Sequence, residues 1–333
     1  MKKFIFGIVT IVFSIVLIVL VGVVSTAYAV TDCTFTTVGT TMTLDADCTT
    51  DATILVPDGY TLEGAGYSIT AVDPSAGYFI GAVVKNVGAT AYVNNLTVKA
   101  SGLANMCHAG ADRLRGIMFE EASGAITKNT VMDINQGLSG CQEGNGIEVR
   151  NAPFDGTHPA TKTVTISHNT VTKYQKTGIV ANGDVKASVT NNYVGSAELP
   201  LNIAANSIQL GFGAYGAVNN NEVVGNQWDV VSTPQWIATA VLVYLAGDVS
   251  VNHNKISGNW TDIGVAAYYS GTVNVMNNTI ARTKTGAGTV DEHGIGVDFY
   301  GNSGKSKVVK NTFEGWNHAY LGEDLAKVNA VSP

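Results

Sequence analysis

The sequence is short of charge, and above all of basic charge. Only 14% of its 333 residues are charged, and 26 acidic against 19 basic side chains give a formal net charge of −7. This acidic balance argues against a nucleic-acid partner, which would require a basic surface. Cysteine is also scarce, and because no Cys-x-x-Cys pair occurs among the four, no zinc site is predicted. Glycine and tyrosine are plentiful, at 37 and 13 residues, which is typical of a β-rich protein with many turns.

Long apolar runs are absent except at the N-terminus, where residues 1–29 are predicted to be a secretory signal peptide. Lys2 and Lys3 precede an apolar run, and Ala27-Tyr28-Ala29 offers a small-residue cleavage site. The apolar run is long enough to cross a bilayer, so an uncleaved membrane anchor is the alternative. Cleavage would change the formal net charge from −7 to −9 by removing the two lysines.

All four cysteines follow this segment, so they would be exported with the chain to a secreted or extracellular location. An even number of cysteines in an oxidising compartment favours two disulfides, although four cysteines allow three pairings and buried free thiols are the alternative. The simplest pairing joins neighbours in the sequence, which are Cys33 with Cys48 and Cys107 with Cys141.

A six-residue pattern, in which Asn lies between two apolar positions, occurs eight times between residues 93 and 313. Ile166-Ser167-His168-Asn169-Thr170-Val171 is one copy. Such strands cannot bury an apolar face alone, so the copies are expected to stack as coils of a solenoid. Asn tolerates left-handed backbone and carries donors and acceptors, so we expect a hydrogen-bonded column at one corner. The predicted column contains Asn95, Asn129, Asn169, Asn192, Asn221, Asn254, Asn278 and Asn311.

A second strand, usually opened by Gly, stands before most copies of the Asn pattern. Gly146-Ile147-Glu148-Val149-Arg150 is typical, with apolar residues at its second and fourth positions. This period of two places those residues inside and the third and fifth positions on the surface. The two predicted surface rows are Met118, Glu148, Val180, Gln209, Leu242, Ala266 and Gly296, and Glu120, Arg150, Asn182, Gly211, Tyr244, Tyr268 and Asp298.

The paired Gly-Ile-x-Val and Ile-x-x-Asn-x-Val strands resemble the right-handed parallel β-helix repeats of the pectin-lyase-like superfamily. The resemblance covers roughly residues 50 to 320 and implies an all-β solenoid whose Gly-Ile strand lines a substrate groove. The sequence as a whole is expected to have four parts: the signal segment 1–29, an N-terminal cap and first coil 30–75, β-helix repeats 76–320 and a tail 321–333. The catalytic elements of polygalacturonases, such as Asn-Thr-Asp and Gly-His-Gly, do not occur here, and neither does the Arg-x-Pro-x-x-Arg element of pectate lyases.

The predicted surface rows contain one cluster of charge suited to catalysis. Glu120 and Arg150 are neighbours on adjacent coils, and Glu148 lies about 8 Å from Glu120 at the backbone, by the usual strand spacings. Two carboxyls at about 6.5–9.5 Å suit inverting glycoside hydrolysis. A Glu beside an Arg on neighbouring strands is also ordinary decoration of a solvated sheet, so Glu120, Glu148 and Arg150 are weak catalytic candidates.

Carbohydrate binding without catalysis is the favoured functional hypothesis. Tyr244 and Tyr268 offer flat amphipathic surfaces for sugar rings, and Asn182, Gln209 and Asp298 offer polar contacts on the same face. The expected partner is an extracellular polysaccharide or cell-surface glycan, with membrane contact only through an uncleaved N-terminus. A scaffold role is equally compatible, and a polysaccharide lyase or glycoside hydrolase at Glu120, Glu148 and Arg150 is the alternative.

Long insertions stand over the coils that carry this charge, at residues 102–115, 136–145 and 151–162. They would wall one side of the groove, and a Cys107–Cys141 disulfide would tie two of them together. Asp155 and His158 in the third insertion lack the spacing of a calcium loop, so no metal or other cofactor is predicted.

Overall fold

The computed structural model describes residues 31–100, 102–104, 106–137, 140–154, 160–197, 203–228, 236–285, 293–323 and 327–328. The predicted signal segment and the Asp155–His158 stretch lie outside these residues. Among the described residues, no helix is long and apolar enough to cross a membrane.

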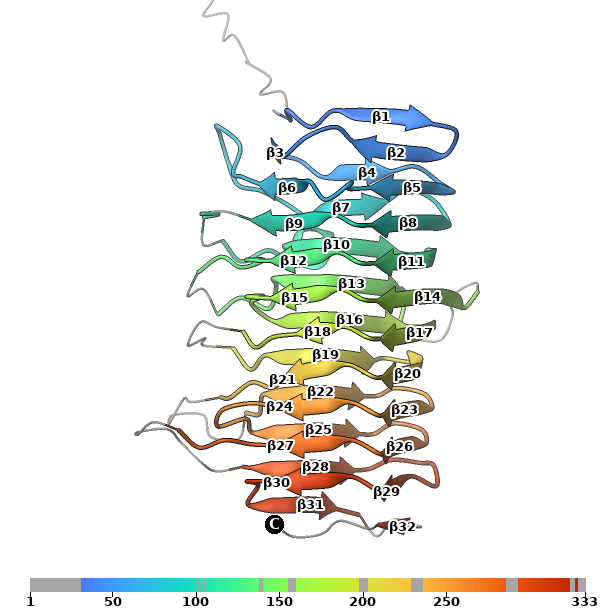
Figure 1. The fold of residues 1–333 in the computed structure, drawn as a ribbon, viewed down its shortest axis with the longest axis vertical. Coiled ribbons are helices and arrows are strands. Elements are labelled where there is room, and N and C mark those ends of the chain that lie inside the picture. Colours follow the sequence, from blue (N-terminus) through green and yellow to red (C-terminus); the bar gives the residue numbers. More distant parts are fainter. Residues whose placement is uncertain are drawn as a thin grey trace, which may run out of the picture.

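The described chain is a three-sided solenoid, as the repeats predicted, and Figure 1 shows its coils stacked from β1 at one end to β32 at the other. Each coil contributes one strand to each of three sheets, which we call sheets I, II and III. The registers are parallel between coils, and β1 and β2 are the only antiparallel pair among the described strands, beside an isolated antiparallel bridge between Thr31 and Thr50. This confirms the all-β parallel β-helix architecture.

Sheet I contains the Gly-Ile strands, which are β4 (Ile54–Val56), β7 (Ala82–Asn86), β10 (Arg115–Glu120), β13 (Asn145–Asn151), β16 (Thr177–Gly183), β19 (Asn206–Gly211), β22 (Thr239–Tyr244), β25 (Ile263–Tyr268), β28 (Ile295–Tyr300) and β31 (His318–Gly322). A short 3-10 helix, η1 (Gly110–Asp112), precedes β10. The glycine that opens these strands is required by close packing: a Cβ on Gly116 would lie 2.4 Å from the Gly146 carbonyl oxygen.

Sheets II and III hold the two halves of the Asn pattern. Sheet II contains β1 (Phe35–Val38), β2 (Thr41–Leu44), β5 (Tyr60–Glu63), β8 (Thr90–Asn94), β11 (Ser123–Thr127), β14 (Lys162–Ser167), β17 (Val185–Thr190), β20 (Tyr215–Asn219), β23 (Val249–Asn252), β26 (Val273–Met276), β29 (Lys307–Val309) and β32 (Lys327–Val328). Sheet III contains β3 (Cys48–Thr50), β6 (Ser68–Ala71), β9 (Thr97–Ala100), β12 (Thr130–Met132), β15 (Thr170–Thr172), β18 (Tyr193–Val194), β21 (Glu222–Val224), β24 (Lys255–Ser257), β27 (Thr279–Ala281) and β30 (Thr312–Glu314).

The core is one continuous apolar column inside the three sheets, as expected for strands that cannot bury an apolar face alone. In each coil the inward residues alternate with polar ones, and Ile147, Val149, Ile166 and Val171 of one coil are all fully buried. The same arrangement recurs from Leu44 to Ala319. The coils therefore stabilise one another, and no coil has a separate core.

The Asn column lies at the corner between sheets II and III, on the side of the solenoid away from sheet I. Asn169 shows the repeating pattern. Its Nδ2 donates to Asn192 Oδ1 at 3.0 Å and to the Ile126 carbonyl at 2.9 Å, and its backbone NH donates to the same Asn192 Oδ1 at 2.9 Å. The predicted amide column is thus present, from Asn129 to Asn311.

Two details of the predicted corner are wrong. Leu96, with 1% exposure, occupies the first column position, and Asn95 lies one residue earlier on the surface. The column residues also do not adopt left-handed backbone, because the residue just before each of them makes the turn. These left-handed residues are Asn95, Lys128, His168, Asn191, Asn220, His253, Asn277 and Lys310, with φ between 54° and 58°.

Both disulfides form with the predicted pairing. Cys33–Cys48 joins the chain before β1 to β3 at the N-terminal end, and Cys107–Cys141 joins two of the insertions. The two described clusters of His, Cys, Asp and Glu side chains that are close enough for a metal each contain one of these cystines, so their sulfur atoms are already bonded to each other.

Candidate functional site

The outward face of sheet I carries every candidate site residue that the sequence analysis named. The strand register confirms that Glu120 and Arg150 are direct neighbours, and it pairs Tyr244 with Tyr268. The register is different from the predicted one in the β28 coil, where Asp298 pairs with Ala266 and Tyr300 pairs with Tyr268. Asp298 therefore replaces Gly296 in the first row, and Tyr300 replaces Asp298 in the second. The error arose because the Gly294-Ile295 pair imitates the start of a Gly-Ile strand two residues before the true equivalent, Gly296.

The first row faces outward, but much of it is covered. Met118, Val180 and Ala266 are at most 2% exposed, although a surface position was predicted for each. Ala266 packs with Ile263 and Ile295 beneath Ile237, so segments that cross the outer face bury it. The first insertion also lies against this face, through hydrogen bonds from Arg115 to Gly110, Ala111 and Arg113, and not only beside it as a wall.

Glu148 belongs to this covered part of the row. Its side chain is 7% exposed and accepts from Arg115 Nε at 2.6 Å and from Asn145 Nδ2 at 2.7 Å. The other guanidinium nitrogens of Arg115 donate to the carbonyls of Gly110, Ala111 and Arg113. This buried ion pair therefore holds the first insertion against sheet I, and the covered carboxylate is poorly placed to meet a ligand.

Glu143 reinforces the same insertion. Its buried carboxylate accepts the backbone NH groups of His108 and Leu114, each at 2.8 Å. The Cys107–Cys141 disulfide connects the same two segments covalently. Arg115 and Glu143 were missed as anchors, because a charged residue gives no signal in the sequence that its partner lies about 30 residues away.

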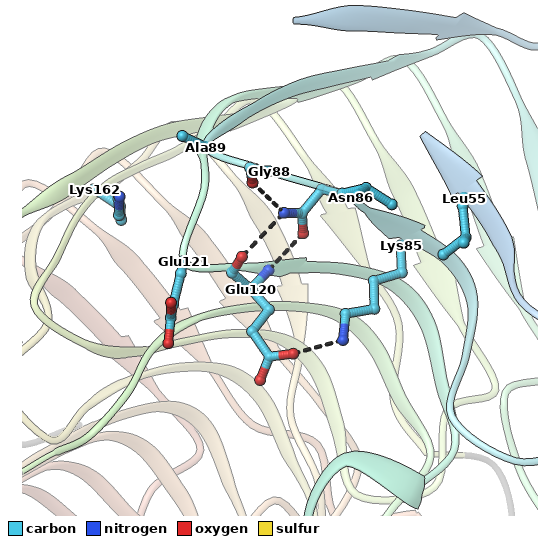
Figure 2. A pocket seen from close by; sticks show the side chains of 9 residues that line it. Leu55, Lys85, Asn86, Gly88, Ala89, Glu120, Glu121 and Lys162 are labelled. Atoms are coloured by element: carbon cyan, nitrogen blue, oxygen red, sulfur yellow. Dashed lines mark hydrogen bonds and ion pairs between the residues drawn. The ribbon is translucent and has the colours of Figure 1, made fainter. Parts of the chain in front are cut away.

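Glu120 lines an open pocket of about 630 Å³, and Figure 2 shows its side chain between Lys85 on one side and Glu121 on the other. Its carboxylate accepts from Lys85 Nζ at 2.6 Å and lies 3.3 Å from Arg150 Nε. Asn86 fixes the Glu120 backbone with two hydrogen bonds, and Lys162 and Glu121 line the opposite side. Burial acts to raise the pKa of Glu120, but the hydrogen bond and charge of Lys85, with the charge of Arg150, outweigh it and hold the pKa below its ordinary value. Glu120 is therefore an ionised group between two cations.

An aromatic series begins beside Arg150 and runs to the C-terminal coils. The Arg150 guanidinium lies 5.8 Å from the ring centroid of Phe154, and that ring stacks on Phe212 at 5.6 Å. Phe154 bridges the intervening coil over Gly183, where a Cβ would meet the Phe154 ring at 2.9 Å.

Edge-on ring contacts continue the series coil by coil. Phe212 contacts Tyr244 at 5.6 Å, Tyr244 contacts Tyr269 at 6.4 Å, and Tyr269 contacts Tyr300 at 5.3 Å. We name the whole series the edge stripe, and it consists of Lys85, Glu120, Arg150, Phe154, Phe212, Tyr244, Tyr269 and Tyr300. The outer members remain open to solvent, since Tyr269 and Tyr300 are 52% and 59% exposed.

The aromatic surface that was predicted from Tyr244 and Tyr268 is thus formed largely by other residues. Tyr244 belongs to it, but the Tyr268 hydroxyl turns away and donates to Asp298 Oδ2 at 2.7 Å. Phe212 and Tyr269 were missed because they follow the strand, at the left-handed corner position, with φ of 54° and 51°. Phe212 and Tyr269 directly follow Gly211 and Tyr268, the last residues of β19 and β25. This position, just after a sheet I strand, is the sequence feature that could have identified them.

Asn182 and Gln209 lie on the two strands between those of Arg150 and Tyr244, and their side chains form a hydrogen bond with each other. Gln209 Nε2 donates to Asn182 Oδ1 at 3.2 Å, and Asn206 Nδ2 donates to Gln209 Oε1 at 3.3 Å. Thr239 in turn donates to Asn206. Both predicted polar residues are therefore half-buried members of a chain of amides, which presents hydrogen-bonding groups at the middle of the face.

A second pocket, of about 460 Å³, opens at the C-terminal end of the edge stripe. Tyr268, Tyr269, Asp298, Tyr300 and Leu321 line it. Burial raises the pKa of Asp298, against the opposing effects of the Tyr268 hydrogen bond and the charge of His293. Burial also raises the pKa of Tyr268, which keeps its hydroxyl protonated as a donor.

Asp262 lies deeper, beneath the segments that cross this part of sheet I. Its Oδ2 accepts the backbone NH groups of Trp228 and Ala238, each at 2.9 Å, and only 2% of the residue is exposed. Burial raises its pKa to about 7, although both hydrogen bonds and the charges of His293 and Arg282 act in the opposite direction. Asp262 thus anchors the crossing segments, in the way that Glu148 anchors the first insertion.

Comparisons with known proteins agree with this architecture. A family model described as a right-handed β-helix region matches residues 156–321. No curated protein matches the chain by sequence.

Solved structures are similar in fold at low identity. The enzymatically active domain of tailspike protein 2 from bacteriophage CBA120 has 13% identity and a TM-score of 0.55, with 87% of this chain and 43% of that chain covered. This chain thus spans less than half the length of the tailspike domain. The A-module of a mannuronan C-5 epimerase from Azotobacter vinelandii has 13% identity and a TM-score of 0.38, with 88% of each chain covered. Parallel coils in three sheets, the amide column and the match to the right-handed β-helix model identify the fold of the chain as a right-handed parallel β-helix.

Proposed function

We propose that this chain is an exported β-helix protein that binds a polysaccharide along sheet I, with the sugar chain lying parallel to the solenoid axis. The edge stripe carries this proposal, because side-chain contacts connect it without a break from Lys85 to Tyr300. Successive coils are about 4.8 Å apart, so rings from consecutive coils form a long, narrow amphipathic surface. Such a surface suits an extended chain of sugar rings better than a compact ligand.

Three further observations support an extracellular glycan as the ligand. The N-terminal segment has the features of an export signal, and two disulfides suit an oxidising compartment. The amides of Asn182 and Gln209 supply polar contacts beside the rings.

Binding to a panel of soluble polysaccharides, measured by affinity electrophoresis, tests this function. Replacing the exposed ring of Tyr300 by Ala should weaken binding of the recognised glycan about three- to tenfold, the usual value of one aromatic contact. Tyr193→Ala is the matched control, because Tyr193 is 40% exposed but lies on sheet III. Equal losses in both variants, or no binding to any glycan, would refute the proposal.

A polysaccharide lyase or hydrolase is the second candidate, and the pocket around Glu120 favours it. An ionised carboxylate beside Arg150 suits a general base with an electrostatic partner. The same glycan panel, analysed for new reducing ends or unsaturated products, separates the candidates. Products that disappear in Glu120→Gln would establish catalysis, and binding without products in the parent protein would exclude it for those glycans.

A further inference from the structure

The pocket at the C-terminal end of the edge stripe combines aromatic walls with one acid. Tyr268, Tyr269 and Tyr300 supply rings, Leu321 supplies an apolar edge, and Asp298 is the only carboxylate among its lining residues. Asp298 and Leu321 are partners in register on β28 and β31, while Tyr268 and Tyr300 are partners on β25 and β28. The pocket therefore lies between two rows of sheet I and is a fixed feature of the sheet.

Asp298 accepts a hydrogen bond here but has no lysine or arginine partner among the described residues. The Tyr268 hydroxyl occupies Oδ2, and no described lysine or arginine lies within ion-pair distance of the carboxylate. The charge of His293 and the Tyr268 hydrogen bond both act to lower the pKa of Asp298, but burial outweighs them and raises it. A half-buried carboxylate without a cation is costly, so a positive ligand group would be stabilised beside it.

The rings around Asp298 favour the same kind of ligand group. Tyr269 and Tyr300 are perpendicular, with an interplanar angle of 89°, and form an exposed corner of two aromatic surfaces. A cation near the face of an aromatic ring is attracted by the ring quadrupole, and an ammonium carrying carbon groups also makes apolar contact. Apolar walls and one carboxylate thus complement an ammonium group better than they complement an anion.

We propose that this pocket binds the ammonium group of an amino sugar, and that the polysaccharide on the edge stripe carries free amines. This rests on the proposed function, since the pocket is the end of the same stripe. At the other end of the stripe, Lys85 and Arg150 flank Glu120, so ammonium groups would be disfavoured there. The two ends therefore give the bound chain a direction, with its free amine at Asp298.

Calorimetric titration of the parent protein with two hexasaccharides at neutral pH tests this proposal. One is a hexamer of glucosamine and the other a hexamer of N-acetylglucosamine, which differ only in the charge and acetylation of the amine. We expect the glucosamine hexamer to bind at least about tenfold more tightly, as one carboxylate contact and one cation–π contact imply. Asp298→Asn keeps the shape of the side chain and should remove most of this preference.

Glu314→Gln is the control for net charge, since Glu314 is an exposed acid on sheet III and its replacement removes the same negative charge. This variant should keep the full preference, and a preference that falls equally in both variants would overturn the pocket assignment. Equal affinity of the parent for both hexamers would overturn the ammonium proposal and leave glycan binding intact. Binding of neither hexamer, with another glycan bound through Tyr300, would also overturn it, whereas failure of every glycan refutes the proposed function itself.

Discussion

At the scale of single residues, the corner between sheets II and III uses two adjacent positions for different purposes. The residue at the first position makes the turn with a left-handed backbone. The Asn at the second position places its buried side-chain amide in the hydrogen-bonded column. The repeated Asn predicted the column from sequence, because an amide that both donates and accepts can repeat its bonds indefinitely. Sequence could not separate the two positions in Asn94-Asn95-Leu96, since Asn suits either one and only packing places Leu96 inside.

Removing one amide of the Asn column should lower the stability of the protein without weakening the proposed glycan binding. Asn169→Ala would lose the donors to Asn192 and Ile126 and would leave the buried Asn129 groups without their acceptor. We expect the free energy of unfolding to fall by roughly 2–4 kcal/mol, from lost bonds and unsatisfied partners. Chemical denaturation measures this, and Thr165→Ala, an exposed change on the same coil, should have little effect. A folded Asn169→Ala protein with weakened glycan binding would show that the column also serves the site.

At the scale of elements, the site was predicted less completely than the fold. The period of two correctly placed Glu120, Arg150, Asn182 and Tyr244 on the outer face of sheet I, because strand geometry alone determines which side a residue faces. It could not show that insertions lie on that face and bury Glu148. It also placed Asp298 two residues out of register, because β28 begins after a Gly-Ile pair that imitates the repeat.

Glu148 provides a direct test of how the first insertion is held. Glu148→Gln would leave the Arg115 guanidinium buried, at 2% exposure, without its counter-charge. Breaking a buried pair in this way costs about 3–5 kcal/mol, so we expect a large fall in thermal stability and faster proteolysis within residues 102–114. Glu120→Gln removes an ion pair at 24% exposure, and it should cost about 1 kcal/mol or less. Equal stability of Glu148→Gln and the parent would contradict an anchoring role and return Glu148 to the catalytic candidates.

At the scale of the whole molecule, stability is a series of contacts between neighbouring coils. Each strand pairs only with the equivalent strand of the next and preceding coils, apart from the β1–β2 pair at the N-terminal end. A solenoid of this kind responds to damage locally, because one coil can open while distant coils stay paired. The edge stripe crosses successive coils of sheet I, so the glycan binding that we propose would depend on the strand register of many coils at once.

The Cys33–Cys48 disulfide lies at the N-terminal end of the described coils, where β3 and β4 each pair with one described strand only. It constrains a 15-residue separation, worth about 3 kcal/mol in the chain-entropy model, and holds the segment before β1 to β3. Replacing both cysteines by Ser should increase amide hydrogen exchange in β1–β6 and leave exchange in β24–β30 unchanged. The Cys107/Cys141 double replacement is the matched control, because it should loosen residues 106–114 and 140–144 and spare β1–β3. Exchange that rises uniformly through all three sheets would instead show that the coils unfold as one cooperative unit. The hypothesis that single coils open while distant coils stay paired would then be wrong.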